Sequence, residues 1–155
     1  MSEKSTTPNF STLLLHPWPG LAAMLILFNA FYLRLHHAGF WSGKLSDVGI
    51  CFLLPVLLAA SWMLVSKIIH SIRPQQKLPQ PAHVALVSCL IAAAYFSALN
   101  LLPGFPHFHQ SMMGFWVERP IHPTMDVTDL FCLAFTVAAY VFIRQKLEGG
   151  VQTQK

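Results

Sequence analysis

Two short segments of the chain each place a hydroxyl and a carboxylate directly before a long apolar run. The first contains Ser46 and Asp47, shortly after Lys44, and the second contains Asp126 and Asp129. The spacing of Asp126 and Asp129 puts both on one face of a helix. Carboxylates that share a small area bind a cation or raise the pKa of one member. If the fold brings the two segments together, these five residues are the candidates for catalysis or cation binding.

Histidines near the two segments add nitrogen ligands to the same region. His36 and His37 precede the first segment, and His122 opens the second. Imidazole and carboxylate ligands together suit zinc or another divalent transition metal. A metal-bound water would hydrolyse a substrate, whereas the acids alone would relay protons or ions. The chain has no HExxH motif, so the sequence allows a divalent metal without specifying one.

Four further residues are candidates for substrate binding. Asn29 and Asn100 occur late in apolar segments, where they either hydrogen-bond across helices or contact a substrate. Trp41 and Trp116 lie in the polar stretches beside these segments. They either anchor the chain at a bilayer interface or line the site.

Helix capping explains the same polar residues without any chemistry. Ser46 or Asp47 can cap a helix, because a side-chain oxygen accepts from the free N–H groups of the first turn. Asp126 and Asp129 have the spacing of a capping pair, and their charge suits the positive end of a helix dipole. The sequence leaves both interpretations open.

The composition is typical of an integral membrane protein. Of the 155 residues, 54% are hydrophobic and 10% are charged, whereas soluble domains carry roughly 25% charged residues. Intrinsic disorder is excluded for the same reason. The Lys and Arg residues are dispersed among short loops, so nucleic acid is not an expected partner. The lipid bilayer is the expected one.

The apolar stretches predict an all-α membrane protein with four transmembrane helices. A span needs roughly 20 apolar residues, and helices satisfy their backbone polar groups in lipid. We expect a disordered cytoplasmic tail over 1–11, a four-helix bundle over 12–144 and a second cytoplasmic tail over 145–155. The expected spans are residues 13–35, 46–69, 82–102 and 127–143.

The positive-inside rule predicts that both termini are cytoplasmic. The two candidate segments then face outward, which is the periplasm if the membrane is a bacterial inner membrane. Seven basic residues lie in the tails and the middle loop, and three lie in the other loops. The seven are Lys4, Lys67, Arg73, Lys77, Arg144, Lys146 and Lys155, and the three are Arg34, Lys44 and Arg119.

The two halves of the chain share three features in the same order. These are a late Asn, a Gly-Phe-Trp tripeptide and a pair formed by a hydroxyl residue and Asp. Such a parallel repeat predicts two hairpins related by an axis along the membrane normal, which would bring the outer loops together. The matched residues are Asn29 and Asn100, 39–41 and 114–116, and 46–47 and 128–129.

The run GKLSDVG at 43–49, followed by an apolar stretch with Pro55, resembles a motif of uncharacterised bacterial four-helix integral membrane proteins. The segment DVTDL at 126–130 resembles an Asp-x-Thr-Asp-Leu segment before their last helix. The resemblance covers most of the chain and implies the same membrane fold. It implies no established activity, but it adds weight to the candidate carboxylates and Lys44.

Three functions are compatible with these features. The first is an inner-membrane protein whose periplasmic Asp/His/Lys site binds a cation or acts on an envelope substrate. The alternative is a non-enzymatic accessory or immunity protein that recognises a membrane-inserted partner. A third is haem or quinone chemistry at His16, His70 and His83. A homo-oligomer is a further expected partner, because four helices enclose only a narrow interior.

Two features of the apolar segments predict local structure. Pro55 inside the second span should kink the helix and free a carbonyl that a neighbour must satisfy. Cys51, Cys89 and Cys132 form no CxxC pair and lie in apolar segments. They are expected to be small buried hydrophobic residues.

Overall fold

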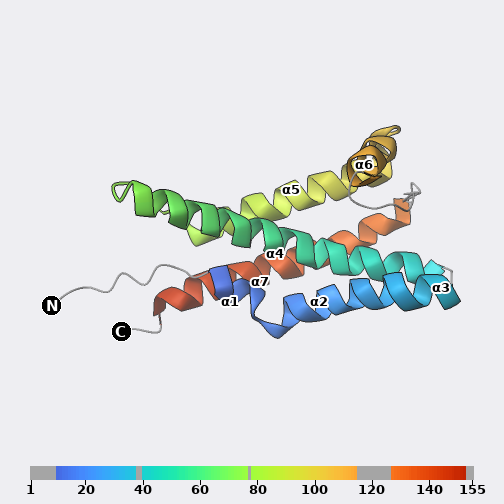
Figure 1. Ribbon diagram of the computed structural model, residues 1–155, viewed down its shortest axis with the longest axis horizontal. Coiled ribbons are helices and arrows are strands. Elements are labelled where there is room, and N and C mark those ends of the chain that lie inside the picture. Colours follow the sequence, from blue (N-terminus) through green and yellow to red (C-terminus); the bar gives the residue numbers. More distant parts are fainter. Residues whose placement is uncertain (1–9, 38–39, 77, 115–126, 153–155) are drawn as a thin grey trace.

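The structure is a computed structural model that describes residues 10–37, 40–76, 78–114 and 127–152 (Figure 1). Every element in these ranges is a helix. Two of them depart from α geometry: η1 is a π-helix and η2 is a 3-10 helix. In chain order they are α1 (Phe10–Leu14), α2 (Pro17–Phe28), η1 (Asn29–Leu33), α3 (Arg34–His36), α4 (Phe40–Ile72), α5 (Pro81–Leu101), α6 (Phe105–Gly114), η2 (Val127–Leu133) and α7 (Ala134–Gln152).

Three helices of the described chain are long and apolar enough to cross a membrane. They cover Lys44–Ile72, Pro81–Leu101 and Val127–Gly149. The described residues thus confirm the all-α fold, and these three helices have the length and composition of membrane spans. The expected first span, 13–35, contains a shorter apolar helix, Pro17–Leu33. Its start is displaced because Pro17 holds His16 in an extended conformation, which separates α1 from α2.

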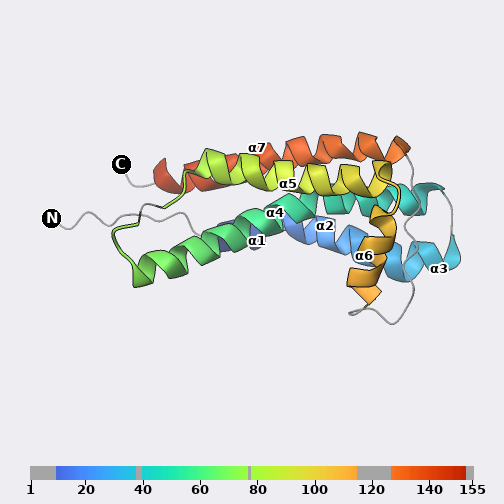
Figure 2. The ribbon, with the colours of Figure 1, turned by 90° about the horizontal axis from the view of Figure 1, so that it is seen from above.

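The long helix α4 is the centre of the bundle. It packs against α1, α2, α5 and α7, and α5 and α7 also pack against each other. Figures 1 and 2 show α2 beside one stretch of α4 and α5 beside α7. Because successive helices reverse direction, the starts of α4 and η2 lie at one end with α3 and α6. We call this the site end. The opposite tail end holds α1, the turn from α4 to α5 and the end of α7.

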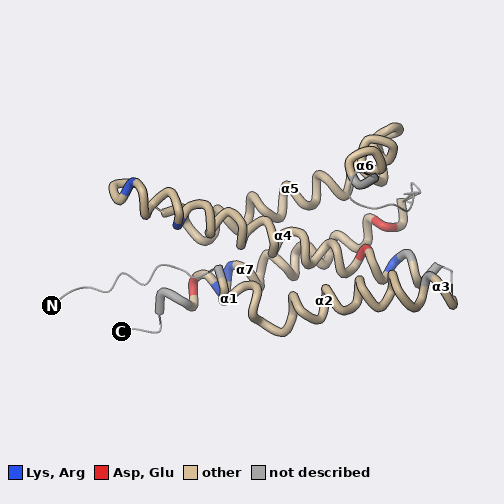
Figure 3. The backbone as a smooth tube through the Cα atoms, viewed as in Figure 1, with Lys and Arg blue, Asp and Glu red and all other residues tan. Residues whose placement is uncertain are grey.

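The charged residues lie at these two ends, and the middle of the bundle is almost free of them (Figure 3). The site end carries Lys44, Asp47 and Asp129 among its described side chains. The tail end carries Lys67, Arg73, Arg144 and Lys146 together with Glu148. This separation is typical of a bundle whose middle lies in hydrocarbon.

The helices approach closely because small residues lie where they cross. Ala59 and Ala60 of α4 meet Ala85 of α5 and Ala139 of α7 in the main buried cluster. Gly49 has the same effect between α2 and α4. A Cβ on Gly49 would lie 2.6 Å from Ile26 Cγ1 and 3.2 Å from the Ala22 carbonyl oxygen. Small residues at such crossings are the usual basis of helix packing in membranes.

The carbonyl freed by Pro55 has a partner on another helix. Pro55 is fully buried in α4, and its missing N–H leaves the Cys51 carbonyl without its helical donor. The Thr136 hydroxyl of α7 donates to this Cys51 oxygen at 3.1 Å. The expectation that a neighbour satisfies the carbonyl freed by Pro55 is confirmed, and the three cysteines are buried, as expected.

The start of α4 and the content of the third loop differ from the expectation. The second span was expected over 46–69, but α4 begins at Phe40. Ser46 and Asp47 therefore lie inside the helix, and a capping role for them is wrong.

The third loop contains the helix α6, which was not expected from the sequence. Gly104, at φ 90°, makes the turn from α5 into α6 with a backbone conformation that disfavours other residues.

Candidate functional site

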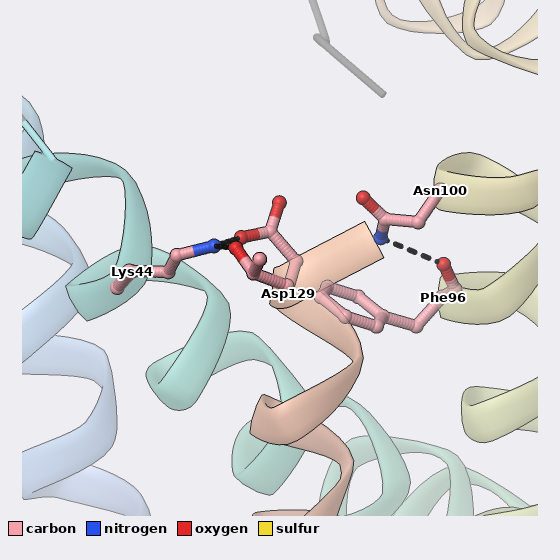
Figure 4. Close-up of polar contacts among 5 residues, drawn as sticks. Lys44, Phe96, Asn100 and Asp129 are labelled. Atoms are coloured by element: carbon pink, nitrogen blue, oxygen red, sulfur yellow. Dashed lines mark hydrogen bonds and ion pairs between the residues drawn. The ribbon is translucent and has the colours of Figure 1, made fainter. Parts of the chain in front are cut away.

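Lys44 and Asp129 form an ion pair that joins the starts of α4 and η2. The Lys44 ammonium also donates to the Thr128 hydroxyl. The two charged side chains are only 15% and 14% exposed. Figure 4 shows Lys44 pointing from α4 toward the Asp129 carboxylate. Residues from the two halves of the chain thus meet at the site end.

Asp47 contributes a second carboxylate to the same region. It lies on α4 less than one turn after Lys44 and is half-buried. Asp47 and Asp129 both act electrostatically on the Cys132 thiol of η2, as does Lys44. Two carboxylates and one ammonium therefore share a small volume where α4 meets η2.

Asn29 links the first apolar helix to α4 beside these charges. Its side chain is fully buried, and its amide nitrogen donates to the Ser42 carbonyl and to the Ser46 hydroxyl. Asn29 Oδ1 has no hydrogen-bond partner among the described residues. Asn29 also opens the π-helix η1, and π-helical turns occur often at functional sites.

Asn100 lies near the end of α5, on the other side of η2 from Lys44 (Figure 4). Its amide nitrogen donates to the Phe96 carbonyl at 3.0 Å, within its own helix. The amide nitrogens of Asn29 and Asn100 thus donate to different kinds of partner. Asn29 links two helices, whereas Asn100 donates to the Phe96 carbonyl of its own helix, α5.

Within the described part of the chain, the candidate histidine ligands His36 and His37 form no metal-ligand group with the carboxylates. His36 and His37 are exposed, and each ring packs on Tyr32. The described residues contain no group of three or more His, Cys, Asp or Glu side chains that could hold a metal ion. Four candidates lie outside the described part of the chain: Asp126, His122, Trp116 and the side chain of Trp41.

A hydrogen bond between Tyr95 and His109 holds α6 against α5 at the same end. The Phe105 ring also packs against Tyr95, with centroids 5.7 Å apart. Desolvation by burial lowers the pKa of His109 below its ordinary value of 6.5. The sequence analysis did not select His109 or Tyr95. The alternation of Phe, His and Met over 105–113 is the signal that could have predicted a surface helix.

The atoms around Lys44 that could ligate a cation are carboxylate oxygens and a hydroxyl oxygen. Asn29 adds a buried amide oxygen one helix away. Oxygen donors suit hard cations such as Mg²⁺, Ca²⁺ or Mn²⁺ better than they suit zinc. These oxygen atoms therefore suit a hard cation better than the zinc or other divalent transition metal that the sequence allows.

In comparisons with known proteins, the chain matches no protein-family model, no curated protein and no solved structure.

Proposed function

We propose that the protein is a small multi-pass protein of the bacterial inner membrane whose periplasmic face carries a binding site for a hard cation. In this proposal four helices cross the bilayer as two hairpins, α2 with α4 and α5 with α7. Pro17–Leu33 makes the first crossing. The basic tail end lies in the cytoplasm by the positive-inside rule, so Lys44, Asp47 and Asp129 lie near the outer surface.

The position of the Lys44 ammonium carries this proposal. It contacts a carboxylate oxygen of Asp129 and the hydroxyl of Thr128 together, and these are the ligands that hard cations take. Lys44 thus acts as a cation tethered to the protein, and Asp47 supplies a second carboxylate close by. A free cation binds when it displaces the Lys44 side chain toward water.

A Lys44→Met variant tests this competition directly. In buffer without divalent ions the variant should unfold at a lower temperature than the parent, because Asp129 loses its counter-charge. Millimolar Mg²⁺, Ca²⁺ or Mn²⁺ should restore the melting temperature, since the cation replaces the missing ammonium. A purely structural ion pair predicts the loss without the rescue.

The control variants separate this site from the other charges. Asp47→Asn and Asp129→Asn should abolish the rescue in the Lys44→Met background. Glu148→Gln is the matched control, because Glu148 is an exposed carboxylate at the tail end that pairs with Arg144 at 2.8 Å. The proposal would be contradicted if all three carboxylate variants showed the same rescue of the melting temperature by divalent cations. It would also be contradicted if no cation raised the melting temperature of Lys44→Met.

A further inference from the structure

A lipid-facing groove runs along one side of the bundle between α2 and α7. Both helices pack on α4, which forms the floor, rather than mainly on each other. The groove has a volume of about 620 Å³, which lies within the range of roughly 300–1,000 Å³ typical of ligand sites. Its lining includes Ala22, Gly49, Phe52, Phe142 and Gln145.

The lining of the groove is apolar except at one end. Trp18 of α2 and Gln145 of α7 lie at the tail end, where an indole N–H and an amide can face polar groups. No acidic residue is among the described residues that line it. The groove thus joins an apolar channel to a polar mouth, as an amphipathic ligand requires.

Two residues, Lys146 and His16, lie close to this mouth. Lys146 lies one turn beyond Phe142 on α7, and the His16 ring packs on Phe142 with centroids 5.1 Å apart. Burial and then the charge of Lys146 lower the pKa of His16 from its ordinary value of 6.5. The His16 ring can therefore offer a hydrogen bond at the mouth, while Lys146 supplies the positive charge.

The length of the groove matches one leaflet of a bilayer. Its lining on α7 extends from Phe135 to Gln145, which is about 15 Å at 1.5 Å per residue. The hydrocarbon core of a bilayer is about 30 Å thick, so a single leaflet is about half of that. A transmembrane helix of a partner would need a groove of twice this length.

We propose that this groove binds an anionic phospholipid, with one acyl chain between α2 and α7 and the phosphate beside Lys146 and His16. Charge complementarity at the mouth and the single-leaflet length select this occupant over a zwitterionic lipid or a protein helix. Basic residues between helices at a cytoplasmic surface are a recurring basis of anionic headgroup binding. None of Lys44, Asp47 and Asp129 is among the residues that line the groove, so either proposal can fail alone.

Native mass spectrometry of the full chain in detergent tests the headgroup preference. Dioleoylphosphatidylglycerol should bind at least about fivefold more tightly than dioleoylphosphatidylcholine. Lys146→Gln should reduce this ratio to near one. Lys67→Gln is the matched control, because Lys67 is an exposed lysine at the same end on α4, outside the groove, and should leave the ratio unchanged.

A second pair of variants tests the acyl-chain channel. Ala138→Trp places a large side chain in the groove lining and should weaken binding of both lipids. Ala94→Trp, at an exposed position of α5 outside the groove, should not. Equal affinity for the two lipids, or equal effects of Lys146→Gln and Lys67→Gln, would overturn the proposal. A dimer that Ala138→Trp dissociates, without lipid preference, would assign the groove to a second copy instead.

Discussion

Lys44 links the two halves of the chain through a largely buried contact. Exposed ion pairs contribute about 0–1 kcal/mol, whereas removing one partner of a fully buried pair costs roughly 3–5 kcal/mol. Because its side chains are about 15% exposed, the cost of breaking the Lys44–Asp129 pair should lie between these limits. We expect Lys44→Met to lower the free energy of unfolding by about 1–3 kcal/mol.

A double-mutant cycle measures this coupling. The variant Lys44→Met with Asp129→Leu should recover part of the loss, because it leaves no unpaired charge. Reversible unfolding in mixed detergent micelles, followed by circular dichroism, provides the four free energies. Strict additivity of the two single changes would show that the ion pair carries no coupling energy.

His109 gives the site end a local pH dependence. Its pKa is lowered in the folded protein, so the unfolded state binds more protons near pH 6. The contribution of His109 to the stability of the folded state is fully present above pH 6.5. It decreases as the pH falls through the pKa of His109 in the folded protein. Hydrogen exchange of the α6 amides should therefore be faster at pH 5.5 than at pH 7.5, after correction for the intrinsic rates. His109→Gln should abolish the difference.

At the scale of the helices, Pro55 and Thr136 act as one unit. Thr136→Val would leave the Cys51 carbonyl without a donor inside the bundle. Hydrogen bonds between membrane helices contribute about 0.6 kcal/mol on average and up to about 1.7 kcal/mol. We expect a cost near the upper value, because an unsatisfied buried carbonyl also carries a desolvation penalty.

Pro55→Ala is the background in which this interpretation can be checked. The alanine N–H restores the helical donor to Cys51, so Thr136→Val should cost less in that background than in the parent. Steric trapping or detergent unfolding measures both differences. The same cost in the two backgrounds would mean that Thr136 stabilises α7 by some other contact.

Gly49 sets the distance between α2 and α4. Gly49→Ala should destabilise the protein by about 1–3 kcal/mol, because the new methyl overlaps Ile26 and approaches the Ala22 carbonyl. Ala94→Ser, at an exposed position on α5, is the control for a change of similar size. Stability equal to that of the parent would show that α2 is free to move away from α4.

The helices were predictable from the sequence to different degrees. Long apolar runs identified the three long helices, because hydropathy sums over many residues. The start of α4 at Phe40 was not predictable, since Lys44, Ser46 and Asp47 resemble the end of a loop. Their inclusion in α4 depends on tertiary partners, Asn29 for Ser46 and Asp129 for Lys44. A single sequence does not reveal such partners.

At the scale of the whole molecule, reversing helices explain why distant polar residues share one end. The sequence predicted that Lys44, Asp47 and Asp129 lie on one side, because an even number of crossings separates their segments. It did not predict that Lys44 pairs with Asp129, since the pairing depends on the rotation of two helices about their axes. For the same reason, the sequence did not predict that Lys44 contacts oxygen atoms of Thr128 and Asp129.

Cysteine labelling tests the orientation of the whole bundle. The native cysteines are buried, so an introduced thiol gives the signal. Gln76→Cys, in the turn between α4 and α5, should react with a membrane-impermeant maleimide only after the cells are opened. Ser111→Cys on α6 should react in spheroplasts. The reverse pattern would place the Lys44–Asp129 pair in the cytoplasm.

The hydrogen bond from Thr136 to Cys51 also has a consequence for biogenesis. The ribosome completes α4 long before it reaches Thr136, so the nascent chain enters the translocon with the Cys51 carbonyl exposed by Pro55. Until the last helix emerges, water in the translocon or another membrane protein must satisfy that oxygen. Release of α4 into lipid is therefore more favourable once α7 has arrived, and a chain truncated before α7 should be a preferred target for membrane proteases.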